Sequence, residues 1–327
     1  MSKIVRAGVI GAGVFGRIHA QKYAAHSDTE LVGCFDSSTD ASRALAKAMN
    51  CRSFDRLDTL LEACDIVSVA TPATNHFEVA KRALLAGRST LVEKPLAASF
   101  DEASELVALA RAQNRILAVG HQERLTLEAL GIFALPERPI SIEAIRISSN
   151  TQRGDDVPVA LDLLVHDANL VLTLLGEDRP ALVSAGPGST GRTDSSVIAD
   201  VGFSSGVRAR MSAQRQAPVN RRELNLVYPS GYIRIDFLNR KIEHDLPHDL
   251  PVIKADRSVF EDPVGENIHR FIQTVTATRK GPAVDGQAGL SAVWLAETID
   301  AVARSGETWT EHRPELLGRR VSSVSVL

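Results

Sequence analysis

The first 120 residues alternate between short apolar runs rich in β-branched residues and longer runs with helical spacing. Runs of the first kind are typical of buried strands, and runs of the second kind are typical of amphipathic helices. Strands that alternate with helices favour a doubly wound parallel sheet with helices on both faces. The expected strands are 4–10, 31–35, 66–70, 90–92 and 116–119, and the expected helices are 17–25, 41–49, 77–86 and 100–112.

After Gly120 the apolar positions recur with a period of two. Residues 139–148 alternate, and two longer segments have turn residues at their centres, as antiparallel hairpins do. Helical spacing returns in three places. The fold class expected is α/β: a doubly wound domain over 1–120, and an α+β domain over 121–327 with a mostly antiparallel, open sheet. The expected hairpins are 195–216 and 221–241, with turns at Gly206 and 229–231, and the expected helices are 161–175, 264–278 and 290–304.

Composition narrows the class of protein. The 327 residues suit two domains, and 37 basic against 40 acidic residues give a net charge of −3. This balance argues against a nucleic-acid partner and against a membrane surface. No apolar run reaches the ~18 residues of a membrane helix. The cysteines, Cys34, Cys51 and Cys64, form no C-x-x-C pair, which favours a reducing compartment and a cytoplasmic protein.

A glycine motif follows the first expected strand and opens the first expected helix. Gly11 permits a tight turn, Gly13 permits close approach of a diphosphate, and Gly16 permits close helix packing. Asp36 ends the second expected strand at the spacing typical of dinucleotide-binding proteins. Its carboxylate would accept ribose hydroxyls and repel a 2′-phosphate, so NAD is favoured over NADP. The predicted cofactor contacts here are Gly11, Gly13, Val14, Phe15, Gly16, Asp36 and Ser37. The alternatives are a turn without a ligand, and for Asp36 a cap or turn residue.

Polar residues also follow two further strands of the first half, at the carboxyl edge where open α/β sheets bind ligands. Lys94 directly follows one strand, in the sequence Glu93-Lys94-Pro95, and can sit beside a nicotinamide. The alternatives are helix capping by Thr74 and Asn75, a structural role for His76, and a surface ion pair for Lys94. The predicted cofactor contacts at this edge are Thr71, Pro72, Asn75, His76, Glu93 and Lys94.

An apolar helix expected at 161–175 has Asp162 and His166 four residues apart, on one face. A carboxylate can fix the tautomer of an imidazole and raise its basicity, as in a general base. A buried pair that satisfies only itself is the alternative. His244 and His248 are also four apart, but Pro247 lies between them and excludes a helix. A solvated loop is therefore favoured there, and no metal site is predicted.

Taken together, these motifs resemble the Gfo/Idh/MocA oxidoreductases. The resemblance rests on 11–16 with His19, 70–72 with His76, 84–87, 93–96, 120–121 with Arg124, and Asp162 with His166. It implies a Rossmann domain followed by a domain whose open sheet often forms oligomer contacts, hence a homodimer or homotetramer. It also implies hydride transfer between a nicotinamide and a secondary alcohol of a sugar or cyclitol. Two alternatives are a glycosidase that holds NAD tightly and a non-catalytic NAD-binding sensor.

The resemblance also implies roles for individual residues. Lys94, Asp162 and His166 form the catalytic group: His166 takes the hydroxyl proton, Lys94 hydrogen-bonds the substrate oxygen, and Asp162 orients His166. Arg124 and Arg153 join them as substrate contacts, and the Lys94–Pro95 bond is expected to be cis. The family's usual Gly-Gly pair is absent from 157–160, and Asn169 replaces an acid, which leaves the substrate open. The link from 124 to 142, with Arg153, is similar to UDP-N-acetylglucosamine 3-dehydrogenases of the family.

Overall fold

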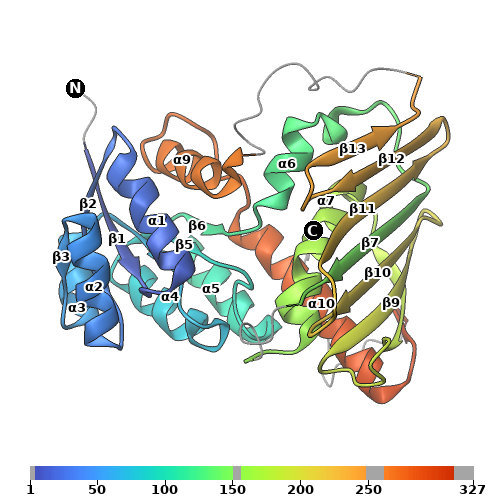
Figure 1. Cartoon of the computed structure of the whole chain (residues 1–327), viewed down its shortest axis with the longest axis horizontal. Helices are drawn as coiled ribbons and strands as arrows, with labels where there is room; N and C mark the ends of the chain where they lie inside the picture. The colour runs from blue at the N-terminus through green and yellow to red at the C-terminus, as the bar shows by residue number, and fades with distance from the viewer. Residues whose placement is uncertain (1–3, 150–155, 248–260, 313–327) are drawn as a thin grey trace. The chain divides into compact units, whose positions relative to one another are not determined.

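The computed structural model describes residues 4–149, 156–247 and 261–312 (Figure 1). The chain divides into two compact units, Met1–Leu125 with Glu261–Leu290, and Thr126–Phe260 with Ser291–Leu327. This division differs from a single boundary at residue 120, because the segment 261–290 returns to the first unit. The cause is the amphipathic helix α9 (Pro263–Val275), which buries Ile268, Phe271 and Ile272 in the core of the first unit.

The first unit is built on a six-stranded sheet in the order β3-β2-β1-β4-β5-β6. Every pairing in it is parallel. The strand order reverses between β1 and β4, which is the arrangement of a Rossmann domain and confirms the predicted fold class. The strands are β1 (Val5–Ile10), β2 (Thr29–Phe35), β3 (Arg52–Ser53), β4 (Ile66–Val69), β5 (Ser89–Val92) and β6 (Leu117–Val119).

Helices connect these strands and begin where the sequence supplies caps. The hydroxyls of Ser38 and Ser99 accept backbone N–H groups at the starts of α2 and α5. Asp262 caps α9 in the same way. The elements are α1 (Val14–Ala25), α2 (Thr39–Met49), α3 (Leu57–Ala63), η1 (Ala73–Asn75), α4 (His76–Leu85), α5 (Phe100–Ala112) and α6 (Glu123–Ala129), of which α6 continues into the second unit.

The second unit is built on an eight-stranded sheet in the order β13-β12-β11-β7-β10-β9-β8-β14. Neighbouring strands are antiparallel except β7 and β10, which are parallel. Both predicted hairpins form, and Gly206 adopts a φ of +91° in the first turn. The strands are β7 (Ser141–Ile147), β8 (Pro180–Pro187), β9 (Ser196–Phe203), β10 (Arg208–Gln214), β11 (Arg221–Tyr228), β12 (Gly231–Asp236), β13 (Lys241–His244) and β14 (Trp309–Thr310).

One face of this sheet is buried and the other is open, as the alternating burial along β7 and β10 shows. A π-helical turn η3 (Ala160–Leu164) packs against β10 on the covered side and continues as α7 (Val165–Leu175). The helix predicted at 161–175 therefore exists, but its first turn is wider than an α-helix. The remaining elements are η2 (Ile132–Ala134) and α10 (Gly286–Ser305). No helix in the described ranges combines the length and apolarity that crossing a membrane requires.

Candidate active site

The glycine motif forms the turn between β1 and α1, and each glycine meets a different constraint. Gly11 has a φ of +100°, and a Cβ there would lie 2.5 Å from the carbonyl oxygen of Ala70. A Cβ on Gly16 would lie 1.8 Å from the carbonyl oxygen of Gly11, so α1 packs directly on the turn. A Cβ on Gly13 would meet no atom within 4 Å. Two of the glycines thus serve packing, whereas Gly13 borders open space.

That open space suits the diphosphate of a dinucleotide. Gly13 caps α1, whose first turn has no acidic residue, and Val14 and Phe15 beside it are exposed. The unpaired N–H groups and the positive dipole end of a helix N-terminus attract phosphate oxygens. A second indication comes from Thr71, which follows β4: its Oγ1 is buried and has no hydrogen-bond partner among the described residues. The residues present therefore fit NAD.

Asp36 lies beside the glycine turn. Its Oδ2 accepts a hydrogen bond from the backbone N–H of Ala12 at 2.6 Å, and its Oδ1 accepts one from that of Ser38 at 2.8 Å. The exposed Ser37 hydroxyl lies 3.5 Å from Oδ1. Asp36 is therefore a turn residue, and this role is compatible with cofactor binding because each carboxylate oxygen has a further lone pair.

His76 holds two backbone turns together. Its Nδ1 lies 2.6 Å from the carbonyl oxygen of Pro95, and its Nε2 lies 3.0 Å from that of Thr71. The ring is buried, and burial lowers the pKa of His76 below its ordinary value. Pro72 and Asn75, which precede it, are exposed. Contacts from these residues to a cofactor stay predictions.

Lys94 follows β5 and differs from its neighbours in exposure. Residues 91–93 and 95–97 are buried, whereas Lys94 is partly exposed. The Lys94–Pro95 bond is cis, as the resemblance implies. Glu93 points inward, where its Oε1 lies 2.9 Å from Nε2 of His19 and accepts from Nε2 of Gln122 at 3.0 Å. The segment thus buries the side chains on either side of Lys94.

In the second unit, Asp162 lies in η3 and His166 lies in the first turn of α7, and both are buried. Arg215 donates from Nε to Oδ2 of Asp162 at 3.3 Å and from Nη2 to the carbonyl oxygen of Val157 at 2.7 Å. Sequence reasoning missed Arg215. The signal was present: 209, 211 and 213 are apolar and face inward on β10, and 215 continues that alternation.

A second arginine faces inward for the same reason. Ile142 and Ala144 of β7 are buried, and Arg146 continues their phase. Arg146 forms a two-point ion pair with Asp167, with Nε to Oδ2 at 3.0 Å and Nη2 to Oδ1 at 2.7 Å. Each buried arginine therefore neutralises a carboxylate on the segment that also bears His166.

The other predicted residues are less informative. Arg124 is partly exposed on α6, and Arg153 lies outside the described residues, as does His248. His244 ends β13 rather than lying in a loop, which corrects the expectation for that histidine. Among the described residues, no group of three or more His, Cys, Asp or Glu side chains is placed to hold a metal.

Comparison with known proteins assigns the family. Residues 5–121 match the model described as the oxidoreductase family with an NAD-binding Rossmann fold, GFO_IDH_MocA. UDP-N-acetylglucosamine 3-dehydrogenase of Acidithiobacillus ferrooxidans is 32% identical over 297 residues, 87% of this chain and 93% of that protein. The chain belongs to the Gfo/Idh/MocA oxidoreductase family. Its cofactor is NAD, and it is a dehydrogenase acting on CH–OH groups, as predicted.

The likeness to solved structures extends over most of the chain. A solved structure of the same Acidithiobacillus ferrooxidans enzyme has a TM-score of 0.83 at 31% identity and covers 92% of this chain and 98% of its own. The WlbA dehydrogenase from Bordetella pertussis, solved with NADH and UDP-GlcNAcA, has a TM-score of 0.83 at 20% identity over 95% of this chain and 98% of its own. The second likeness shows the fold.

Proposed function

We propose that this chain is an NAD-dependent sugar dehydrogenase that oxidises the 3-hydroxyl of a UDP-linked amino sugar. The observation that carries the substrate assignment is the 32% identity to UDP-N-acetylglucosamine 3-dehydrogenase over 87% of the chain. An inositol 2-dehydrogenase of Rhizobium meliloti, 27% identical over 65% of this chain and 69% of that protein, supports the broader class of polyhydroxylated alcohols.

In this proposal the first unit holds the cofactor. The turn at Gly11, Gly13 and Gly16, with Val14 and Phe15, binds the diphosphate, and Asp36 with Ser37 binds the adenosine ribose. Thr71, Pro72, Asn75 and His76, with Glu93 behind Lys94, define the end of the site that meets the nicotinamide. When bound, NAD supplies a hydride acceptor for the alcohol carbon.

The chain's own residues handle the proton and the charge on oxygen. His166 accepts the hydroxyl proton as the hydride leaves the carbon, so the alcohol becomes a ketone and the electrons balance. The Lys94 ammonium donates a hydrogen bond to the same oxygen and stabilises its developing negative charge. Asp162, held by Arg215, orients His166, and Arg124 and Arg153 bind polar groups of the substrate.

A substrate panel tests this function. The purified chain is mixed with NAD and, separately, UDP-N-acetylglucosamine, other UDP-sugars, inositols and free sugars, while absorbance of the reduced nicotinamide is followed. The proposal expects reduction with UDP-N-acetylglucosamine above all. Turnover without net reduction would point to a glycosidase, and tight NAD binding with no turnover would point to a sensor.

Two variants test the residue roles in the same assay. Lys94→Met removes the donor to the substrate oxygen, and His166→Asn removes the base, so each is expected to lower kcat by roughly a hundredfold or more. Calorimetric titration with NAD serves as the control, because neither side chain is assigned to the diphosphate or ribose. Loss of NAD binding instead of kcat would contradict these roles.

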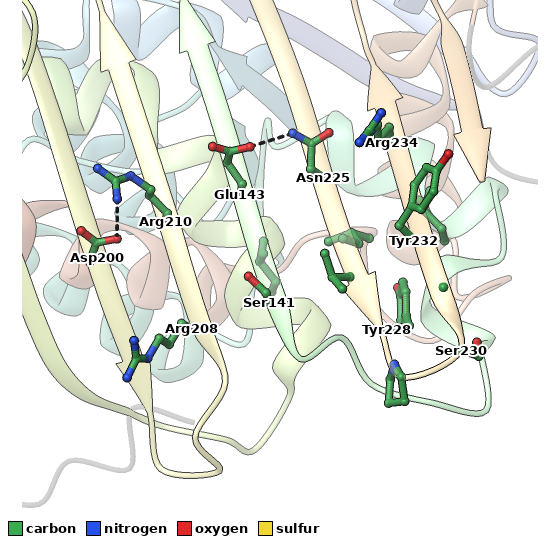
Figure 2. Close-up of a pocket in the computed structure, with 16 residues that line it drawn as sticks. Ser141, Glu143, Asp200, Arg208, Arg210, Asn225, Tyr228, Ser230, Tyr232 and Arg234 are labelled. Carbon is green, nitrogen blue, oxygen red and sulfur yellow. Dashed lines mark hydrogen bonds and ion pairs between the residues drawn. The ribbon is translucent and has the colours of Figure 1, made fainter. Parts of the chain in front are cut away.

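We further propose that a second copy of the chain covers the open face of the eight-stranded sheet, giving a homodimer or homotetramer. A hollow of about 850 Å³ lies on that face. Figure 2 shows basic side chains on it, among them Arg208 and Arg210, near the acidic Asp200 and Glu143. The apolar Val227, which also lines the hollow, is 43% accessible. Mixed charge with exposed apolar area suits a self-complementary interface.

The mass of the particle in solution tests this surface. Val227→Glu is expected to convert the oligomer to a monomer in light scattering, because it adds a charge to the proposed contact. Leu85→Glu, which changes an exposed residue of α4, is the matched control and is expected to leave the oligomer intact. A monomeric mass for the wild type would contradict the proposed interface. We also place the enzyme in the cytoplasm, consistent with its three free cysteines.

A further inference from the structure

A buried chain of hydrogen bonds runs through the first unit from α1 to the residue before Lys94. The Tyr23 hydroxyl lies 2.8 Å from Oγ of Ser68, which lies 2.9 Å from Nδ1 of His19. Nε2 of His19 lies 2.9 Å from Oε1 of Glu93. All four side chains are buried. Polar groups removed from water in this way cost free energy unless each is paired, so the chain needs a reason.

The direction of the protons in this chain can be assigned. Oε1 of Glu93 is an acceptor, so Nε2 of His19 carries a proton and donates it. In the tautomer that carries its proton on Nε2, Nδ1 accepts from the Ser68 hydroxyl, and Ser68 Oγ in turn accepts from Tyr23. Burial raises the pKa of the Tyr23 phenol, which keeps it a donor. In this tautomer each hydrogen bond of the chain points toward the Glu93 carboxylate.

A second donor and a glycine complete the surroundings of that carboxylate. Gln122, which follows β6, donates from Nε2 to Oε1 at 3.0 Å. A Cβ on Gly120 would lie 2.7 Å from both carboxylate oxygens of Glu93. The residue after β6 must therefore lack a side chain for the carboxylate to occupy this position.

The backbone is also fixed at Pro95, directly after Lys94. Nδ1 of His76 lies 2.6 Å from the carbonyl oxygen of Pro95. Glu93 before Lys94 and Pro95 after it are thus both fixed by buried partners, and Lys94 between them is the residue that remains partly exposed. Such an arrangement restricts where the lysine side chain can reach.

We propose that His19, Glu93 and Gln122 are positioning residues, which hold the backbone of Lys94 so that its ammonium is directed at the substrate oxygen. The inference rests on the proposed role of Lys94. Misplacing a catalytic group by ~1 Å costs roughly a hundredfold in rate, so a network that fixes its backbone affects kcat. Because His19 lies on α1, the network also ties the helix at the diphosphate turn to the lysine segment.

Two substitutions of His19 distinguish the loss of its hydrogen bond to Glu93 from the loss of the imidazole ring itself. His19→Gln places an amide N–H near the position of Nε2 and can still donate to Glu93. His19→Asn is too short to do so. We expect His19→Asn to lower kcat roughly tenfold or more, His19→Gln to restore most of it, and both to keep the NAD Kd of the wild type. Gly120→Ala, which pushes the carboxylate directly, is expected to reproduce the loss if His19→Asn fails to fold.

A measurement without substrate keeps this proposal separate from the proposed function. The rate at which an amine-acylating reagent modifies Lys94 is followed by mass spectrometry, with the exposed Lys47 of α2 as internal reference. His19→Asn and Gly120→Ala are expected to change the Lys94 rate by about twofold or more, since the segment is released. If the wild type oxidises no sugar, the proposed function fails while this readout still decides the network.

Tyr23→Phe is the matched buried control. It removes the hydroxyl at the end of the chain farthest from Glu93 but leaves His19 and Glu93 paired. It is expected to lower Tm while keeping kcat and Lys94 labelling near wild-type values. The proposal is overturned if His19→Asn and Gly120→Ala fold yet leave both kcat and Lys94 labelling unchanged. It is equally overturned if they change NAD affinity alone.

Discussion

Asp36 accepts a hydrogen bond from the backbone N–H of Ala12 at 2.6 Å, which joins the end of β2 to the glycine turn after β1. The same carboxylate accepts the N–H of Ser38 at the start of α2. One side chain therefore shapes the turn assigned to the diphosphate, and we propose that its charge also discriminates between NAD and NADP.

This dual role predicts the effect of Asp36→Asn. The amide removes the negative charge and turns a nitrogen toward one of the two backbone donors, which costs about 2 kcal/mol. We expect weaker NAD binding, a lower Tm and a narrower gap between the dissociation constants for NAD and NADP. Titration with both cofactors measures this, with Glu62→Gln, which removes an exposed carboxylate of α3, as the control. An unchanged ratio of the two constants would show that Asp36 does not select the cofactor.

Substitutions at two glycines of the turn are expected to separate an effect on NAD binding from an effect on protein stability. Gly13→Ser places a good N-cap at the start of α1, and its Cβ would meet no atom within 4 Å, so Tm should not fall. Its side chain enters the space assigned to the diphosphate, so the NAD Kd should rise roughly tenfold or more. Gly16→Ala should instead lower Tm, because its Cβ would lie 1.8 Å from a carbonyl oxygen. Normal NAD binding by Gly13→Ser would place the diphosphate elsewhere.

Arg215 is predicted to matter far more to stability than an arginine in an exposed ion pair. The side chains of Arg215 and Asp162 are 10% and 12% exposed, whereas those of Arg82 and Asp58 are 48% and 52% exposed. Arg215→Met leaves a buried carboxylate without this cation and should cost about 3 kcal/mol. Arg82→Met should cost less than about 1 kcal/mol. Urea unfolding of both variants compares them, and similar losses would refute the argument from burial.

The stability of the first unit should depend on the protonation of His26. Its Nδ1 accepts the N–H of Asp28 at 3.1 Å, so Nε2 carries the proton shared with Nδ1 of His269 at 2.9 Å. Partial burial, and then His269, lower the pKa of His26 below its ordinary value. Below about pH 6.5 the unfolded chain therefore binds more protons than the folded one, and stability falls as pH falls.

The measurement is Tm from about pH 7.5 to about pH 5.5 for the wild type and His26→Asn. The variant lacks the group with the lowered pKa, so its Tm should fall less steeply over this interval. Parallel curves would show that the histidine pair does not contribute to the pH dependence.

Much of the fold could be predicted because its signals are local. Alternating apolar runs predicted the parallel sheet, and Gly206 marks a real turn of positive φ. The short β3 and α3 left no periodic signal of useful length. The return of α9 to the first unit could not be predicted, because an amphipathic helix shows that one face is buried but not against which core.

The candidate site shows the same limit. The glycines, Asp36 and Lys94 stand next to strands, so sequence spacing places them at a strand end. Arg146 and Arg215 required a different inference, since a charged residue in an inward phase is buried only when a carboxylate meets it. That partner comes from η3 or α7, far from these arginines in the sequence. The sequence of Ala160–Leu164 also does not distinguish a π-helical turn from an α-helical one, because the segment has only five residues.

The transfer of one hydrogen atom from the sugar to the cofactor tests the proposed function most directly. UDP-N-acetylglucosamine deuterated at carbon 3 is mixed with NAD and the enzyme, and the reduced cofactor is analysed by mass spectrometry. The proposed function predicts that deuterium appears in the reduced nicotinamide and that Lys94→Met slows its appearance without weakening NAD binding. Consumption of the sugar with no deuterium in the cofactor would contradict it.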